Sequence, residues 1–160
     1  MDAIQLVDRP VKSRYLVIAI IVTILGVALA ATSIAQIGFQ FHPNSGIIFN
    51  PLMYSQSLNI VAGDKAAINY TKIMTLNVQK TVATMTVTTQ ATNTLQIFST
   101  LALTLSFNST QVNLNGLQNQ TLTFNLNKGV YLISSSLSYV ALPSINSTLT
   151  GSWTINISGN

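Results

Sequence analysis

The stretch LQIFSTLALTLSFN, residues 95–108, decides the fold class, because its hydrophobic residues recur at every second position. A period of two is typical of a β-strand that covers a core with one face and meets water with the other. Phe98 falls out of phase, so we expect a β-bulge near Phe98–Ser99. The in-phase set is Leu95, Ile97, Ser99, Leu101, Leu103, Leu105 and Phe107.

The same alternation recurs along residues 36–160 and predicts an all-β domain. Glycine-containing turn signals separate the runs at Ala62–Asp64, Asn115–Gly116 and Lys128–Gly129. About seven or more short strands in a chain of this length indicate a β-sandwich. Trp153 shares the phase of its apolar neighbours and is expected in the core. The further runs are Ala83, Met85, Val87; Leu122, Phe124, Leu126; Tyr131, Ile133, Leu137, Tyr139; and Trp153, Ile155, Ile157.

A local pattern narrows the sandwich type. Leu126, Gly129 and Tyr131 form a Leu-x-x-Gly-x-Tyr arrangement that resembles the tyrosine corner of immunoglobulin-like sandwiches. The resemblance implies that the Tyr131 hydroxyl bonds backbone a few residues upstream and that the motif opens a strand. The alternative is a β-turn at Gly129 followed by a core tyrosine.

An uncharged segment of 21 residues, Tyr15–Ala35, precedes the β domain. As a helix it would span about 31 Å, the thickness of one bilayer core. Arg9, Lys12 and Arg14 lie on its N-terminal side, so the positive-inside rule places residues 1–14 in the cytoplasm. We expect residues 15–35 to be a transmembrane or signal helix, and residues 36–160 to be an extracellular domain at the cell membrane.

Three fates of this segment stay open. It is retained as an anchor, or it is a signal peptide cut after a small-x-small site, at Ala35 or after Ala28-Leu29-Ala30. The third fate is a prepilin helix. Lys12-Ser13 resembles a prepilin cleavage site, and the cut would follow Ser13. Arg14 departs from that pattern, because the apolar run of a prepilin begins directly after the cut.

Carboxylates are almost missing from residues 36–160, which contain Asp64 as the one acidic residue. Such a domain has few ion pairs to lose at low pH, so the composition is compatible with life in strong acid. The alternative is compositional drift in a Thr- and Asn-rich protein. The four scattered lysines of this region form no phosphate-tracking patch, so we expect no nucleic-acid partner.

Five sequons make asparagines of this region candidate N-glycosylation sites. Asn69 and Asn156 lie between apolar neighbours, and Asn108 follows Phe107, so a strand would turn these three toward solvent. The five candidates are Asn69, Asn108, Asn119, Asn146 and Asn156.

The residue types of enzyme sites are scarce. His42 is the single histidine and Asp64 the single carboxylate of residues 36–160, and the chain has no cysteine. Hydrolase triads, carboxylate pairs and metal clusters need more of these groups. We therefore expect no catalytic, metal or cofactor-binding residue and no small-molecule substrate.

The expected layout is an apolar N-terminal helix followed by a Thr/Ser/Asn-rich sandwich with sequons. In this layout the chain resembles archaeal surface-filament subunits. These comprise type IV pilins with archaellins, and thread-type filaments built by strand donation. Ile37, Phe39 and Phe41 alternate as a donated strand would, and otherwise form the domain's own first strand. The resemblance implies self-assembly. Archaellum accessory proteins that meet the surface layer share the layout, which leaves a monomeric anchored binding module as the alternative.

Overall fold

The computed structural model describes residues 31–160, which form one compact unit. The expected cytoplasmic residues 1–14, the cleavage candidate Ser13 and most of the expected helix at 15–35 lie outside the described residues. Within 31–160, no helix is long and apolar enough to cross a membrane.

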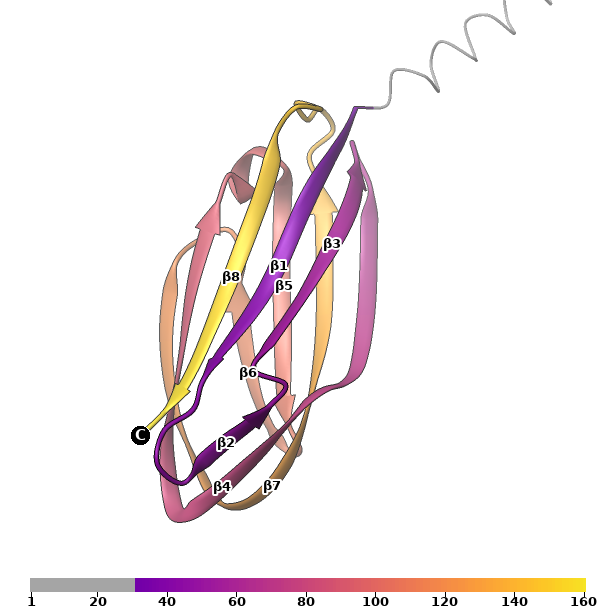
Figure 1. Ribbon diagram of the computed structural model, residues 1–160. Coiled ribbons are helices and arrows are strands. Elements are labelled where there is room, and N and C mark those ends of the chain that lie inside the picture. Colours follow the sequence, from indigo (N-terminus) through magenta and orange to yellow (C-terminus); the bar gives the residue numbers. More distant parts are fainter. Residues whose placement is uncertain (1–30) are drawn as a thin grey trace, which may run out of the picture. The chain divides into compact units, whose positions relative to one another are not determined.

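The described chain is all-β, as the hydrophobic period of two predicts (Figure 1). A single 3-10 turn, η1 (Thr94–Gln96), interrupts the strands. The strands are β1 (Thr32–His42), β2 (Ile47–Asn50), β3 (Met53–Val61), β4 (Lys65–Thr92), β5 (Phe98–Phe107), β6 (Thr110–Asn115), β7 (Gln120–Ala141) and β8 (Thr150–Gly159).

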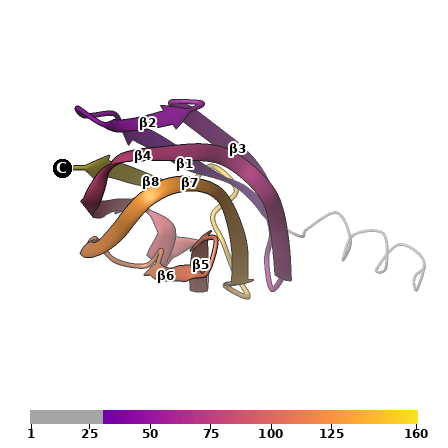
Figure 2. The same cartoon turned by 90° about the horizontal axis from the view of Figure 1, so that it is seen from below.

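Two layers of strands face each other across one core. The first layer runs β3-β1-β8 and continues into the second half of β4 and the first half of β7. The second layer contains β2, the first half of β4, the second half of β7, β5 and β6. Figure 2, seen from below, shows β5 and β6 on the opposite side of the core from β1 and β3.

The long strands β4 and β7 belong to both layers. Their pairing shifts register between Val78 and Val82 of β4, opposite Gly129 and Asn127 of β7. At the same point the buried face changes from even to odd positions, in β4 from Val78 to Ala83. A strand that passes from one layer to the facing one has to invert its inward side, and the extra residues allow it to do so.

This crossing corrects one sequence-based expectation. Lys128–Gly129 was expected to be a turn between strands, yet β7 runs through it from Gln120 to Ala141. Glycine accommodates the bend and the change of face instead of ending the strand. Ala62–Asp64 and Asn115–Gly116 do connect strands, as expected.

The stretch at 95–108 behaves largely as its period predicts. Leu101, Leu103, Leu105 and Phe107 are buried in β5. The expected bulge is present as a register shift between Phe98 and Thr100 against β7. The difference lies at the start, because Leu95 belongs to η1 and is 65% exposed, and the strand begins at Phe98.

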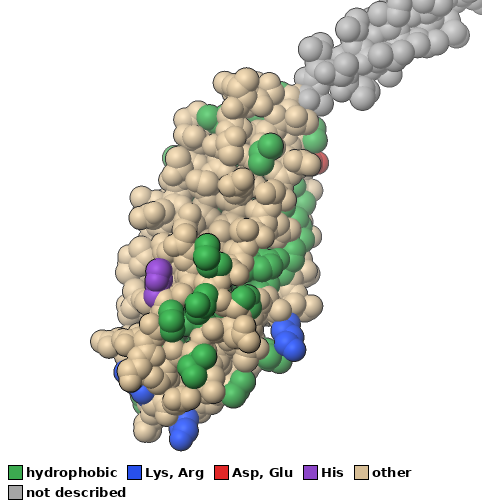
Figure 3. Space-filling view, in the orientation of Figure 1, with side chains coloured by type: hydrophobic (Ala, Val, Ile, Leu, Met, Phe, Trp, Pro, Cys, Tyr) green, Lys and Arg blue, Asp and Glu red, His purple; other side chains and the backbone are tan. Residues whose placement is uncertain are grey.

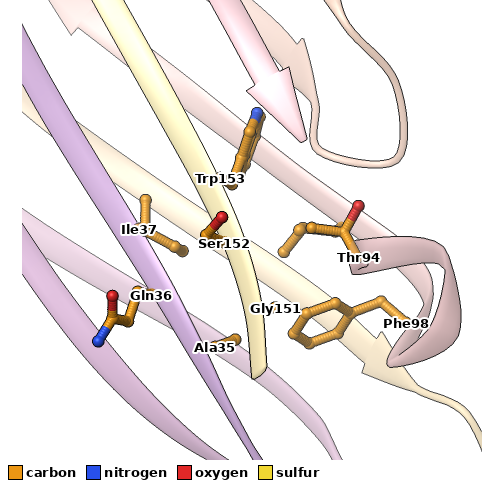
Figure 4. A pocket seen from close by; sticks show the side chains of 9 residues that line it. Ala35, Gln36, Ile37, Thr94, Phe98, Gly151, Ser152 and Trp153 are labelled. Carbon is orange, nitrogen blue, oxygen red and sulfur yellow. The ribbon is translucent and has the colours of Figure 1, made fainter. Parts of the chain in front are cut away.

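Trp153, Ile155 and Ile157 of β8 are buried in the core, as expected from their shared phase. Beside Trp153, the side chains of Ile37, Phe98 and Ala35 line an apolar gap too small to admit a water molecule (Figure 4). The indole nitrogen of Trp153 points away from Phe98 in this view, and it has no hydrogen-bond partner among the described residues. The gap is therefore a packing feature of the core and not a ligand site.

The start of the β domain differs from the expected boundary at residue 36. β1 begins at Thr32, and Thr32–Ala35 already pair with Leu58–Val61 of β3. Ser33 and Ala35 are buried, and the Ser33 hydroxyl donates to the backbone oxygen of Leu149. The apolar sequence thus continues into the sandwich, because the inward positions of a central strand need apolar or small residues just as a membrane helix does.

Candidate functional site

The outer face of the first layer is an uncharged polar surface. Its outward positions alternate with buried ones along β1, β8, β4 and β7, and nearly all carry hydroxyl or amide side chains. Figure 3 shows this face largely free of charged groups. Representative members are Gln36, Gln40, Thr86, Thr88, Gln90, Thr123, Ser152 and Thr154.

Neutral side-chain pairs connect neighbouring strands on the outer faces. Thr84 donates its hydroxyl to Asn125 Oδ1 at 3.1 Å, between β4 and β7. Thr104 donates to Asn113 Oδ1 at 2.8 Å, between β5 and β6. Such cross-strand pairs stabilise a sheet where other proteins use opposite charges, and they do not titrate between acid and neutral pH.

A shallow depression of about 180 Å³ lies on this polar face around Gly38. No heavy atom lies within 4 Å of the place where a Gly38 side chain would begin, so the glycine itself opens the depression. Gln36, Ser55, Ser152 and Thr154 contribute hydroxyl and amide groups to its lining. These groups suit a neutral hydrogen-bonding partner and offer no acid, base or nucleophile activated by one.

The scarce titratable groups do not converge. His42 ends β1, with its Nε2 atom 3.5 Å from Asn156 Oδ1. Asp64 lies in the turn after β3. Val61, the last residue of β3, pairs with Thr32 at the start of β1, so Asp64 lies near the end of β1 that is farthest from His42. At about 3.3 Å per residue, the length of β1 separates the two by roughly 30 Å. In residues 31–160, no group of three His, Cys, Asp or Glu side chains could hold a metal ion.

Burial raises the pKa of two tyrosines on the second layer. For Tyr70, desolvation is the main cause, a hydrogen bond from Gln56 acts in the opposite direction, and Tyr54 adds a smaller upward contribution. For Tyr139, desolvation raises the pKa, and the negative charges of Asp64 and Tyr70 raise it further. Both residues therefore stay neutral over a wider alkaline range than a free tyrosine.

Four of the five candidate glycosylation sites are exposed, namely Asn69, Asn108, Asn119 and Asn146. Asn69 accepts a 2.6 Å bond from Ser136, and Asn146 accepts bonds from the backbone and the hydroxyl of Thr148. Asn119 accepts a 2.8 Å bond from the Ala91 backbone. The fifth candidate, Asn156, faces outward between buried Ile155 and Ile157 but is only half exposed.

Asn108 has a defined structural role besides its sequon. It has a left-handed backbone, with φ of 55°, at the turn from β5 to β6. Its side chain donates to the Val130 backbone oxygen at 3.3 Å and accepts from the Leu132 backbone nitrogen at 3.2 Å. The amide thereby extends the β5–β7 ladder by one step beyond the end of β5.

The candidate donor residues Ile37, Phe39 and Phe41 occupy the chain's own sheet. All three are buried in β1, which lies between β3 and β8. This is the arrangement in which the segment forms the domain's own first strand, one of the two alternatives that the sequence leaves open. The cleavage candidate Ala35 is also buried in β1, so a cut there would remove four residues from a central strand.

The Leu126, Gly129 and Tyr131 pattern lies at the bend where β7 changes layers, and not at the start of a strand as the resemblance implies. Tyr131 donates its hydroxyl to the Asn127 backbone oxygen at 2.8 Å, four residues upstream. A side chain at Gly129 would begin 3.7 Å from the Tyr131 ring. Leu126 is buried below the bend. Together the three residues stabilise the bend at which β7 passes from one layer to the other.

Tyr131→Phe removes the hydroxyl of this bond and keeps the ring. Because the bond is exposed to solvent, water can satisfy the Asn127 oxygen, so we expect a loss of only about 0.5–1.5 kcal/mol in the free energy of unfolding. Urea unfolding of residues 31–160 measures it. A loss above about 3 kcal/mol would instead mean that the Asn127 oxygen is left buried and unsatisfied.

Sequence reasoning missed the exposed apolar residues at the ends of β3. Met53 is 70% exposed and Val61 is 36% exposed. The signal available in the sequence was weak, because their significance depends on β3 being an outermost strand.

No protein-family model matches the sequence, and no curated protein is significantly similar to it.

Proposed function

We propose that the chain is an extracellular structural protein that forms part of a cell-surface filament. In this proposal the apolar segment before residue 31 brings the chain to the membrane, and the β domain, an immunoglobulin-like sandwich, lies outside the cell. The role is non-catalytic, and the partners are the membrane and further copies of the chain or a surface-layer protein. Neither a nucleic acid nor a small-molecule substrate is part of the proposal.

One observation carries the proposal: β1 begins at Thr32, inside the apolar segment that the sequence delimits as Tyr15–Ala35. In the sequence, no spacer separates the apolar segment from β1, a strand with a neighbour on either side. A direct junction suits a subunit whose apolar segment and β domain are held together in an assembly, whereas flexible linkers suit independently moving modules.

The immunoglobulin-like type is supported by the two layers and by the bond from Tyr131 to the Asn127 backbone. The non-catalytic role is supported by the separation of His42 from Asp64 along β1. The uncharged outer face of the first layer and the exposed sequons suit a surface that stays solvated outside the cell.

A monomeric, membrane-anchored surface binding module is the second candidate. The depression around Gly38 favours it, because its hydroxyl and amide lining is open to a neutral polar partner such as a glycan of the surface layer.

The experiment is to determine the N-terminal residue of the native protein and to look for filaments in the same preparation. A mature start at Arg14 with filaments supports the pilin route, and a start at Ala31 or Gln36 supports export with cleavage. A start at Met1 in a protein that forms no filaments would overturn the filament proposal and favour the anchored module. Of the two signal-peptide cuts, we expect the one before Ala31, because the cut before Gln36 removes part of β1.

A further inference from the structure

β3 is an unprotected outermost strand of the first layer. Among residues 31–160 it pairs with β1 alone, in a register that continues without a shift from Met53 to Val61. Figure 1 shows β3 beside β1. None of its nine residues is charged or a proline. Monomeric proteins usually protect such an edge with lysine, proline, a bulge or a short strand, because the free backbone groups can pair with another chain.

Two other outer strands of the described domain are better protected. The first half of β4, at an edge of the second layer, carries Lys65 and Lys72, and Lys72 lies at a register shift with a left-handed backbone. β6 has only six residues, and its apolar residues Val112 and Leu114 are buried. β3 alone among these three combines length, neutrality and exposed apolar side chains.

The exposed apolar residues lie at the two ends of β3 and face outward. Met53 is opposite Gln40 of β1, and Val61 is opposite Thr32. Ile34 of β1, which is 47% exposed, lies opposite Asn59 and so next to Val61 on the same face. One end of the edge thus presents Val61 with Ile34, and the other end presents Met53.

The strand is complementary to itself when two copies run antiparallel with Ser57 opposite Ser57 of the partner subunit. Met53 then lies opposite Val61 of the partner subunit, and Tyr54 lies opposite Ile60 of the partner subunit. Outward positions meet outward positions and inward positions meet inward ones. A slip of one residue would place inward positions opposite outward ones, and a slip of two would separate both Met53–Val61 pairs.

We propose that β3 is an interface for a second copy of this chain, which adds antiparallel in this register and continues the first layer across a two-fold axis. The interface buries Met53 of each copy against Val61 of the other and satisfies the free backbone groups of both edges. Because the same surface is used on both sides, the contact closes as a dimer. It does not depend on the filament proposal, which concerns the N-terminal segment.

Cysteine cross-linking of the full-length protein in detergent tests the register, since the chain has no cysteine of its own. In Ser57→Cys the two new thiols lie on directly opposite residues, with Cα atoms about 5 Å apart, within the range of a disulfide. In the matched control Asn59→Cys, an exposed outward position on the same strand, the two thiols are four residues apart, about 14 Å. We expect mild oxidation to cross-link Ser57→Cys at least about tenfold more than Asn59→Cys.

A mixture of Ser55→Cys and Asn59→Cys should also cross-link, because these positions are opposite each other in the proposed register, although neither variant cross-links alone. Equal cross-linking of Ser57→Cys and Asn59→Cys, or none in either, would overturn the proposal.

Charge pairing gives a readout without a covalent bond. Ser57→Lys and Ser57→Asp each place like charges opposite each other, so each variant alone should sediment as a monomer at a concentration where the unmodified protein is a dimer. Mixing the two variants should restore the dimer. A monomeric unmodified protein, or a mixture that stays monomeric, would overturn the proposal and leave the filament test at the N-terminus unaffected.

Discussion

Replacing Phe39 by aspartate should leave the β domain unable to fold. Phe39 is 3% exposed in the central strand β1, and its ring centroid lies 6.3 Å from that of Phe41 and 5.8 Å from that of Tyr54. A carboxylate there would be buried without a partner, at a cost of several kcal/mol, and the lost aromatic packing adds about 3–5 kcal/mol. The sum is comparable to the whole stability of a domain, about 5–15 kcal/mol.

Far-UV circular dichroism of purified residues 31–160 would measure the loss of strand structure. Gln40→Asp is the matched control. Gln40 follows Phe39 in β1 but is exposed, so the substitution should change the free energy of unfolding by less than about 0.5 kcal/mol. A Phe39→Asp protein that stays folded would contradict the placement of β1 in its own sheet and would favour donation of this segment to a neighbour.

The thermal midpoint of the β domain should stay nearly constant from about pH 7 to about pH 2 and should fall in alkali. On the acid side, Asp64 is the one side-chain carboxylate in residues 31–160. Hydrogen bonds between neutral side chains, such as Thr84–Asn125, connect neighbouring strands on the outer faces. The domain thus has almost no carboxylate interaction to lose on protonation. A steep loss between about pH 5 and pH 3 would show that a carboxylate anion stabilises the fold after all.

On the alkaline side, we expect the stability to fall because the pKa values of Tyr70 and Tyr139 are raised in the folded state. A tyrosine whose pKa is higher in the folded state than the ordinary 10.0 contributes stability that is fully present below that value. The contribution is lost as the pH rises through the native pKa, because the unfolded chain ionises more readily. Tyr139→Phe should lower the alkaline sensitivity in a series of melting curves, and an unchanged alkaline profile would contradict this account.

Local patterns predicted which parts of the chain become strands. The alternation in residues 101–107 and 153–157, and the misfit of Phe98, reflect the two faces of a single strand, so they are visible without knowledge of its neighbours. Lys128–Gly129 could not be interpreted this way, because a glycine at a turn and a glycine at a bend between layers look alike. The register shift between Val78 and Val82 of β4, the strand that pairs with this part of β7, distinguishes a bend from a turn.

The interface candidates depended on pairing, which the sequence does not reveal locally. Ile37, Phe39 and Phe41 have the same pattern whether they fill their own sheet or another one. Met53 and Val61 are ordinary apolar residues unless β3 is an outermost strand, and that position is set by which strands pair with β1. The cleavage candidate Ala35 is similar, since small residues occur both before signal-peptide cuts and inside central strands.

The position of β1 also determines how the domain would bear mechanical load. A pull on the chain at Thr32, directed away from the domain along the strand, acts parallel to β1 and across its hydrogen bonds to both β3 and β8. Because the bonds are spread along the strand and lie across the direction of the pull, they share the force instead of opening one after another as in a peeled hairpin. A tether attached at this end would therefore load two ladders in shear, so we expect the domain to resist a pull at Thr32 strongly.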